Sequence, residues 1–298
     1  MPIRTRSSLV STSSKRRFDD DDYPVPASFL PPQAATDEPD DEQEFSSYVD
    51  AAHGPTPVPD WVITDARAVD SDLGVMKSGK EADVSLLRRS CGDQQVLMAV
   101  KRYRDAKHRL FHRDAGYLEG RRIEGKNARR SREMRAMATR TGFGRELIAG
   151  QWATAEFSVL SRLWQMGAAV PYPVQLSGTE LMMEFIGDED GTAAPRLAQL
   201  RPDRREAEHL FEQLREVLLA VAEAGYAHAD LSPYNILVHR DRLVLIDLPQ
   251  AIDLVGNPHG FEFLRRDCKN VCTWFEARGI HADIDDLYNQ LMRTVPQV

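Results

Sequence analysis

The stretch that decides the fold is His228–Asn235, with the sequence HADLSPYN. Two short apolar runs follow it within residues 236–246, and they predict a β-hairpin that ends at Asp247. Because a hairpin returns the chain to its starting point, we expect Asp230 and Asn235 to lie beside Asp247. Mg²⁺ prefers carboxylate and amide oxygens, and phosphoryl transfer needs a carboxylate beside the attacking oxygen. The pattern therefore predicts a site for phosphate chemistry.

Each of these residues also has a simpler explanation. Taken alone, His228 is equally well explained as a packed histidine, and Asp247 as a turn residue at the end of a strand. The ordered set is much harder to produce by chance than any one member. We therefore favour phosphoryl transfer.

An earlier part of the chain supplies candidates for phosphate binding. Lys101 ends the apolar strand 96–100 in an apolar-Ala-apolar-Lys arrangement, in which the lysine contacts the α- and β-phosphates of ATP. A helix is expected from about Ala153 to Gly167, and Glu156 near its start can hold the ammonium in place. The simpler explanations are a solvated lysine and an acid favoured by the helix dipole.

The segment 77–84, with the sequence KSGKEADV, is expected to form a turn between two strands. Its glycine, hydroxyl and lysines suit a loop that covers phosphates. It matches neither the Walker pattern nor the three-glycine kinase loop, so its signal is weak on its own.

The remaining elements predict an α+β fold with two lobes. Strands at 84–87 and 96–100 flank a turn, and a buried strand is expected at 181–186. The spacing of apolar residues predicts helices over 204–225 and 261–275. A cleft between the lobes is the expected ligand site.

The first 59 residues are rich in Ser, Asp and Pro and show no apolar period, so we expect a disordered tail over 1–59. A solvated leader is favoured, with a partner-binding tail as the alternative. Order should begin near Trp61. The expected domain therefore covers 60–298, with a first lobe at 60–187 and a second at 188–298.

Charge is unevenly distributed along the chain. The net charge is −8, with acidic runs in the first fifty residues and a basic insert over residues 102–150. The insert is either an RNA-binding surface or a basic segment with a solvated face. No aromatic interleaving supports base stacking. Its basic side chains include Arg121, Arg122, Lys126, Arg129, Arg130, Arg132 and Arg135.

Cysteine content and hydropathy favour a cytoplasmic protein without a membrane span. Only three cysteines occur, so no disulfide framework is implied, and Cys268 and Cys272 fall short of a tetrahedral zinc site. We interpret this pair as small apolar side chains on a buried helix face. No apolar run approaches the ~18 residues of a membrane span, and the N-terminus lacks the apolar centre of a secretory signal.

Together the motifs resemble the RIO family of atypical serine/threonine kinases, most closely its RIO-one branch. In chain order they are SGKEADV, AVK, WATAEF, MEFIG, HADLSPYN, LIDLPQA and RRDCKNV. The branch with an N-terminal winged helix is disfavoured because residues 1–59 show no helical pattern. The resemblance implies a compact, protein-kinase-like fold from about Leu73 to the C-terminus.

The resemblance also implies which residues contact the nucleotide. Ser78 is similar to the family's phosphate-loop hydroxyl, Lys101 to its ATP-binding lysine, and Glu156 to the glutamate that pairs with this lysine. Met183 resembles the gatekeeper residue. The backbone of Glu184–Ile186 resembles the adenine-binding hinge.

The same resemblance implies the catalytic groups and the partners. Asp230 resembles the catalytic aspartate, and Asn235 and Asp247 resemble the ligands of Mg²⁺, with ATP as the phosphoryl donor. It implies autophosphorylation on serine, for which Ser131 is a candidate, and ATP hydrolysis through a phosphorylated form of Asp247. A role in maturation of the small ribosomal subunit is also implied, with RNA or a pre-ribosomal particle as a partner.

Several positions depart from the family pattern without removing a catalytic group. Lys77 stands where a small hydroxyl residue is common, Pro233 where an acidic residue is common, and Leu248-Pro249 where smaller residues are common. No Ala-Pro-Glu segment follows Asp247, and Ala229 replaces the arginine that reads activation-loop phosphorylation in ordinary kinases. We therefore expect a constitutively assembled site without a platform for free peptides.

Two other functions remain open. A small-molecule kinase of the aminoglycoside or choline phosphotransferase type uses a similar His-x-Asp-x₄-Asn loop, but SGKEADV and MEFIG argue against it. A slow ATPase switch that acts as an assembly factor is compatible with all of the residues above.

Overall fold

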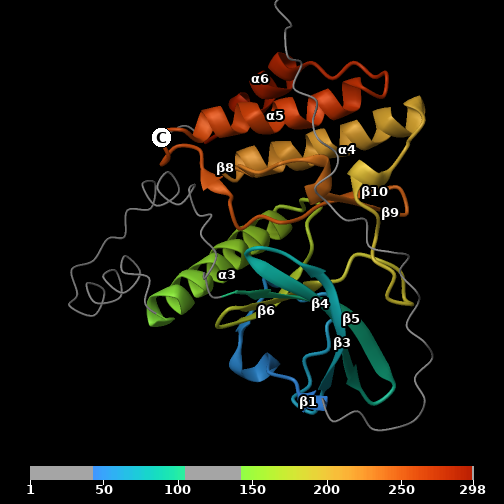
Figure 1. The fold of residues 1–298 in the computed structure, drawn as a ribbon, viewed down its shortest axis with the longest axis vertical. Coiled ribbons are helices and arrows are strands. Elements are labelled where there is room, and N and C mark those ends of the chain that lie inside the picture. The colour runs from blue at the N-terminus through green and yellow to red at the C-terminus, as the bar shows by residue number, and fades with distance from the viewer. Residues whose placement is uncertain (1–42, 105–141, 297–298) are drawn as a thin grey trace, which may run out of the picture. The chain divides into compact units, whose positions relative to one another are not determined.

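The computed structural model describes residues 43–104 and 142–296, which all belong to one compact unit, Pro39–Val298 (Figure 1). The other unit, Met1–Glu38, lies outside the described residues. The strands are β1 (Gln43–Phe45), β2 (Ala52–His53), β3 (Val69–Ser78), β4 (Ala82–Cys91), β5 (Gln94–Tyr103), β6 (Pro173–Ser177), β7 (Glu180–Glu184), β8 (Tyr226–Ala227), β9 (Ile236–His239), β10 (Arg242–Leu245) and β11 (Ile252–Asp253). The helices are α3 (Gly142–Gln165), α4 (Arg204–Glu223), α5 (Gly260–Glu276) and α6 (Ile284–Thr294), with 3₁₀ turns at η1 (Tyr48–Asp50), η2 (Leu197–Gln199) and η3 (Pro233–Asn235).

Seven of these strands form one antiparallel sheet in the order β1-β3-β4-β5-β7-β6-β2. β4 and β5 pair over their whole length around a two-residue turn, in which Gly92 adopts a φ of +58°. Glycine adopts a positive φ without strain, and such turns match the twist of antiparallel strands. The expected hairpin is confirmed, with longer strands than the apolar runs alone indicated.

The predicted disordered tail over residues 1–59 is wrong for the part that the structure describes. β1 pairs with β3 and β2 pairs with β6, so the two short strands extend opposite edges of the sheet. Tyr48 between them is buried in a cluster with Tyr172, whose hydroxyl donates a hydrogen bond to the Pro55 carbonyl at 2.9 Å. Contacts with the sheet therefore order a segment that has no periodic pattern of its own. Residues 1–42 lie outside the described part of the chain.

α3 begins earlier than the sequence indicated, at Gly142 rather than near Ala153. Three glycines within its first nine residues lower the helix propensity there and conceal the start. The end is as expected, because Gly167 adopts a φ of +78° just after the helix. The last residues of the predicted irregular insert are thus helical. Residues 105–141, which include Ser131, lie outside the described residues.

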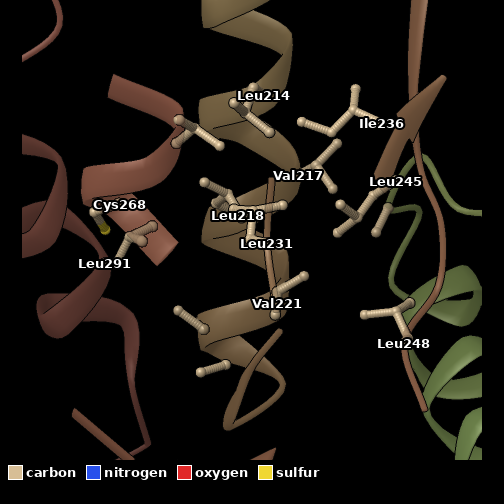
Figure 2. Close-up of a cluster of buried hydrophobic side chains, with 14 of the residues drawn as sticks. Leu214, Val217, Leu218, Val221, Leu231, Ile236, Leu245, Leu248, Cys268 and Leu291 are labelled. Atoms are coloured by element: carbon tan, nitrogen blue, oxygen red, sulfur yellow. The ribbon is translucent and has the colours of Figure 1, made fainter. Parts of the chain in front are cut away.

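The buried core of the second half anchors the segments that carry the predicted site. α4 begins at a capping box between Asp203 and Glu206, and it packs on α6, β8 and β10. Figure 2 shows its buried side chains beside those of the neighbouring segments. The residues labelled there are Leu214, Val217, Leu218, Val221, Leu231, Ile236, Leu245, Leu248, Cys268 and Leu291. Leu231, Ile236 and Leu248 each lie within one residue of a predicted catalytic or metal-binding residue, so the core fixes the chain beside these groups.

The structure has the expected α+β composition, with a sheet-rich first part and a helix-rich second part (Figure 1). The β9–β10 hairpin is present, and positive φ at both Arg240 and Asp241 makes its turn type I′. Cys268 and Cys272 are buried and unpaired on α5, as predicted. Within residues 43–104 and 142–296, no helix has the length and apolar character needed to cross a membrane.

Candidate active site

Lys101 lies in the middle of the sheet, paired with Val84 of β4 and Leu181 of β7. Its ammonium Nζ donates hydrogen bonds to Glu156 Oε1 at 3.0 Å and to Asp247 Oδ1 at 2.6 Å. Lys101 and Glu156 are both buried. Burial alone would lower the pKa of Lys101, but the two carboxylates outweigh it and raise this pKa. The lysine is therefore charged at neutral pH.

Asp247 follows β10 with a φ of +68°, in the left-handed region that Asn and Asp tolerate better than most residues. Burial alone would raise the pKa of its carboxyl, but the Lys101 ammonium prevails and lowers it to about 2. The N–H of Leu248, the next residue, donates to Glu156 Oε1 at 3.0 Å. Glu156 therefore holds both the lysine and the chain that carries Asp247.

Asn235 ends the turn η3, which begins at Pro233, a residue whose fixed φ suits the first position of a helical turn. Its side-chain Nδ2 donates to the Asp230 carbonyl at 2.8 Å, which leaves Oδ1 available to a ligand. Its backbone carbonyl accepts from the Ile246 N–H at 3.0 Å. This bond joins the loop to the segment between β10 and Asp247.

The donor set of this loop and strand fits the predicted metal. Asn235 Oδ1 and the Asp247 carboxylate are hard oxygen donors of the kind that Mg²⁺ binds. Within the part of the chain that the structure describes, no group of three or more His, Cys, Asp or Glu residues could hold a metal. Two protein oxygen ligands suit an ion that takes its other ligands from water and phosphate oxygens, as Mg²⁺ commonly does.

Asp267 of α5 holds the loop in place, a role that was not assigned from the sequence although the motif RRDCKNV contains this residue. Its carboxylate accepts from the N–H groups of Ala229 at 2.7 Å and Leu231 at 3.1 Å, on either side of Asp230. Asn270 on the same helix donates to the Leu231 carbonyl at 2.9 Å. Ala229 has a φ of +65°, a conformation that persists only where neighbours enforce it. From the sequence alone, an acidic residue on an amphipathic helix is interpreted as solvated, so the role of Asp267 was missed.

His228 behaves as a packed histidine, the simpler of its two explanations. It is 1% exposed, and its Nε2 lies 3.1 Å from the Ile246 carbonyl. Its Nδ1 has no hydrogen-bond partner within the described ranges. His228 therefore supports the strand before Asp247 and is turned toward backbone.

Met183, Glu184 and Ile186 lie where β7 ends, beside the strand that carries Lys101. Met183 pairs with Ala99 of β5 and is partly buried. Burial raises the pKa of the Glu184 carboxyl. The Ile186 carbonyl accepts from the Ala194 N–H at 2.9 Å. The predicted hinge is thus an irregular segment that leads directly from the sheet.

The Ser78 hydroxyl is bonded to two neighbouring side chains. Its hydroxyl donates to Asp83 Oδ1 at 2.6 Å and accepts from Arg104 Nη2 at 2.6 Å. A hydrogen bond from Ser78 to a phosphate oxygen would have to replace the bond to Asp83, because a hydroxyl has only one proton to donate. The expected turn between two strands is present, since β3 and β4 pair as far as Ser78 and Asp83.

Lys77, which departs from the family pattern, faces the same side of the sheet as Lys101. Both residues pair with Val84, from opposite neighbouring strands, and directly paired residues share a face. Burial and the nearby positive charge of Arg196 lower the pKa of Lys77. A second ammonium therefore lies near the Lys101 site.

A family model described as the RIO domain matches residues 93–287, which is more than half of the chain. The chain belongs to the RIO family. The RIO-type serine/threonine-protein kinase Rio1 of Haloferax volcanii is 36% identical over 222 residues, which cover 74% of this chain and 68% of that protein. The serine/threonine-protein kinase RIO1 of Saccharomyces cerevisiae is 30% identical over 236 residues, 72% of this chain and 46% of that protein. The predicted RIO-one-type assignment is confirmed, and the chain is an atypical serine/threonine kinase by family.

Solved structures of RIO kinases share the fold of this RIO chain. The Rio2 kinase of Chaetomium thermophilum, in an ADP/Mg²⁺-phosphoaspartate complex, matches with a TM-score of 0.56 and 19% identity. The match covers 76% of this chain and 62% of that one. Such a likeness concerns the fold alone, and it confirms the predicted kinase-like architecture.

Proposed function

We propose that this RIO chain is an ATP- and Mg²⁺-dependent phosphotransferase that phosphorylates serine, its own serines included, and hydrolyses ATP. One observation carries the proposal: the Lys101 ammonium is bonded to both Glu156 and Asp247, beside the Asp230–Asn235 loop. A buried lysine between two carboxylates is costly unless it serves a charged ligand or is fully paired. The position of this lysine on β5 suits the phosphates of ATP.

Each group has a distinct role in the proposed reaction. Lys101, held by Glu156, neutralises negative charge on the α- and β-phosphates. Asn235 and Asp247 hold Mg²⁺, which neutralises charge on the phosphates when bound. Asp230 orients the acceptor hydroxyl and takes its proton. Positioning and electrostatics supply most of the rate, because the loose transition state needs little covalent help from the protein.

For ATP hydrolysis we propose that Asp247 is itself the acceptor. A carboxylate oxygen of Asp247 attacks the γ-phosphorus, the bond to the β-phosphate oxygen breaks, and ADP leaves. Water then attacks the phosphorus of the aspartyl phosphate, which releases phosphate and restores the carboxylate. The Rio2 kinase of Chaetomium thermophilum is known as a phosphoaspartate complex, and this property of a protein with the same fold favours the route here.

The proposed partners follow from charge and from the RIO family. We propose that the basic insert binds RNA, such as that of a pre-ribosomal particle, in the cytoplasm. The basic residues between 121 and 135 that suggest this lie outside the described residues. Binding should weaken steeply with salt, because phosphate contacts release counterions. Salt-independent binding, or binding unchanged after these residues are neutralised, would contradict the RNA proposal.

Of the two rivals, the small-molecule kinase is disfavoured by the RIO family match over residues 93–287. The slow ATPase switch differs from a kinase in where the phosphate goes. Turnover with phosphate release and little labelled serine favours the switch, whereas stoichiometric serine labelling favours the kinase.

The test is incubation of the purified chain with γ-labelled ATP and Mg²⁺, with phosphate release and self-labelling measured together. Asp247→Ala should lower turnover by about 10³ or more, and Asp230→Ala by about 10²–10⁴. Asp247→Asn is the matched control for backbone strain, since Asn tolerates the same positive φ. Normal turnover in well-folded Asp247 variants would overturn the proposal.

The covalent route has its own test. Acid quenching should trap label on Asp247 that hydroxylamine removes. Label found only on serine would contradict the aspartyl phosphate and leave direct transfer to serine.

A further inference from the structure

Tyr103 makes a buried contact with Glu156 that the proposed reaction does not use. It lies at the end of β5, two residues after Lys101, so both side chains face the same side of the sheet. Its hydroxyl donates a hydrogen bond to Glu156 Oε2. Both residues are buried, at 6% and 1% exposure.

The ring of Tyr103 also packs on the helix that carries Glu156. Tyr103 forms a buried cluster with Ala149 and Ala153 of α3 and with Ala82 of β4. Ala149, Ala153 and Glu156 are spaced at i, i+4 and i+7, which places them on one helix face. The two alanines let the ring lie close to the helix, and the hydroxyl then reaches the glutamate one turn further along.

Glu156 therefore receives three kinds of donor, and each has a separate effect. Lys101 provides the positive charge that balances the carboxylate, and the Leu248 N–H attaches the segment after Asp247 to it. Tyr103 is neutral, so its hydrogen bond adds no charge and fixes the direction of the carboxylate. Hydrogen bonds to an ionised acceptor are about twice as strong as neutral ones.

We propose that Tyr103 is a positioning residue that sets the rotation of α3 and aims Glu156 at Lys101. The alternative is that Tyr103 contributes only to packing, and that its hydroxyl bonds to Glu156 without affecting the position of the carboxylate. The two explanations differ in one respect. If Tyr103 acts through Glu156, removal of its hydroxyl should lower the rate of ATP hydrolysis only when the Glu156 carboxylate is present.

The chain offers a matched control for loss of a buried hydroxyl. Tyr172 is also buried in the sheet-rich part, and its hydroxyl donates to the Pro55 carbonyl at 2.9 Å, away from Glu156. Tyr103→Phe and Tyr172→Phe each remove one buried phenol hydroxyl and keep the ring. The Lys101 ammonium lies 5.2 Å from the Tyr103 ring centroid, a contact that phenylalanine retains.

The first test is a double-mutant cycle on single-turnover ATP hydrolysis, which resolves very slow variants. Tyr103→Phe should lower the rate about tenfold in the wild-type background and hardly at all in Glu156→Gln. Tyr172→Phe should have little effect on the rate in either background. Multiplicative losses for Tyr103→Phe and Glu156→Gln would overturn the inference, because they would mean that the hydroxyl acts independently of the carboxylate.

The second test uses the nucleotide-free chain and needs no activity. Amide hydrogen exchange over residues 149–160 of α3 should be faster in Tyr103→Phe than in the wild type, and unchanged in Tyr172→Phe. Unchanged exchange in Tyr103→Phe would also overturn the inference. The catalytic part of the inference rests on the proposed function. Faster exchange in a chain that never turns over ATP would contradict that function and leave the positioning role intact.

Discussion

The two halves of the candidate site are held in different ways. On one side, side-chain charges join β5, α3 and the segment after β10 through Lys101, Glu156 and Asp247. On the other side, the loop around Asp230 is held by its backbone, through hydrogen bonds to Asp267 of α5. A network of charged side chains can exchange partners with a charged ligand, whereas the loop N–H groups are fixed by the buried carboxylate of Asp267. The difference suggests an adaptable phosphate side and a rigid catalytic loop.

Lys101→Met breaks the charge network, and we expect it to have a larger effect than loss of the Asp267 carboxylate that anchors the rigid half. Turnover should fall by about 10²–10³, since the lysine no longer neutralises the phosphates. Two carboxylates are also left without their cation, which should cost about 3–5 kcal/mol of unfolding free energy at neutral pH. Chemical denaturation and phosphate release measure the two losses.

The pH dependence of this stability loss has a definite sign. In the wild type, the Asp247 pKa is lowered to about 2, so its stabilisation is present above an unfolded pKa of about 3.9 and is lost only as pH falls toward 2. Without Lys101, burial raises the pKa of the Asp247 carboxyl in the folded state. The loss of unfolding free energy in Lys101→Met should therefore be largest at high pH and should decrease as pH falls. A deficit that stays constant from pH 8 to pH 5 would contradict the charge network.

Asp267→Asn tests the rigid half and should have an intermediate effect. An amide keeps one acceptor oxygen but turns its NH₂ group toward an N–H of the loop. Turnover should fall about tenfold to a hundredfold, with a stability loss of about 1–3 kcal/mol. Glu276→Gln, an exposed neutralisation on the same helix, is the control and should change neither quantity. Equal behaviour of the two variants would show that the loop does not depend on Asp267.

The smallest effect is expected for the rate of thiol labelling on α5, which reports whether this helix moves when ligand binds. Burial raises the pKa of Cys268 and of Cys272 to about 12, so both thiols should be unreactive at neutral pH until the chain unfolds. Addition of Mg²⁺ and ATP should change their labelling rate only slightly if α5 is rigid. Cys91, partly exposed at the end of β4, should react in the folded chain and serves as the internal reference. Marked acceleration at the α5 thiols on ligand addition would remove the contrast between the two halves.

Local patterns predicted those parts of the fold that carry their own signals. The β9–β10 hairpin and α4 were expected, since alternation, helical spacing and turn residues agree there. β1 and β2 were not, because strands of three and two residues are ordered by the sheet edges they join. The start of α3 escaped prediction because its glycines lower the helix propensity there, while the contacts that hold the helix, such as those of Ala149 and Ala153 with Tyr103 of β5, are long-range.

In the candidate site, too, some residues could be predicted from the sequence and others depend on contacts that only the fold creates. Groups with a chemical signature, such as Lys101 and Asp247, could be named from the sequence. The roles of Asp267 and Tyr103 could not be assigned, although Asp267 lies within the motif RRDCKNV, because each role depends on which backbone amide or carboxylate lies opposite. Ser78 illustrates the converse: its motif predicts a phosphate contact, whereas its hydroxyl is engaged with Asp83.

Leu248 has a consequence for inhibitor design. Its side chain is fully buried in the core (Figure 2), and its N–H is bonded to Glu156. A compound that needs the segment after Asp247 to swing outward would have to expose this leucine, at about 1.5–3 kcal/mol for the side chain alone. Compounds for this chain should therefore bind with the segment after Asp247 left in place, and should interact with Lys101.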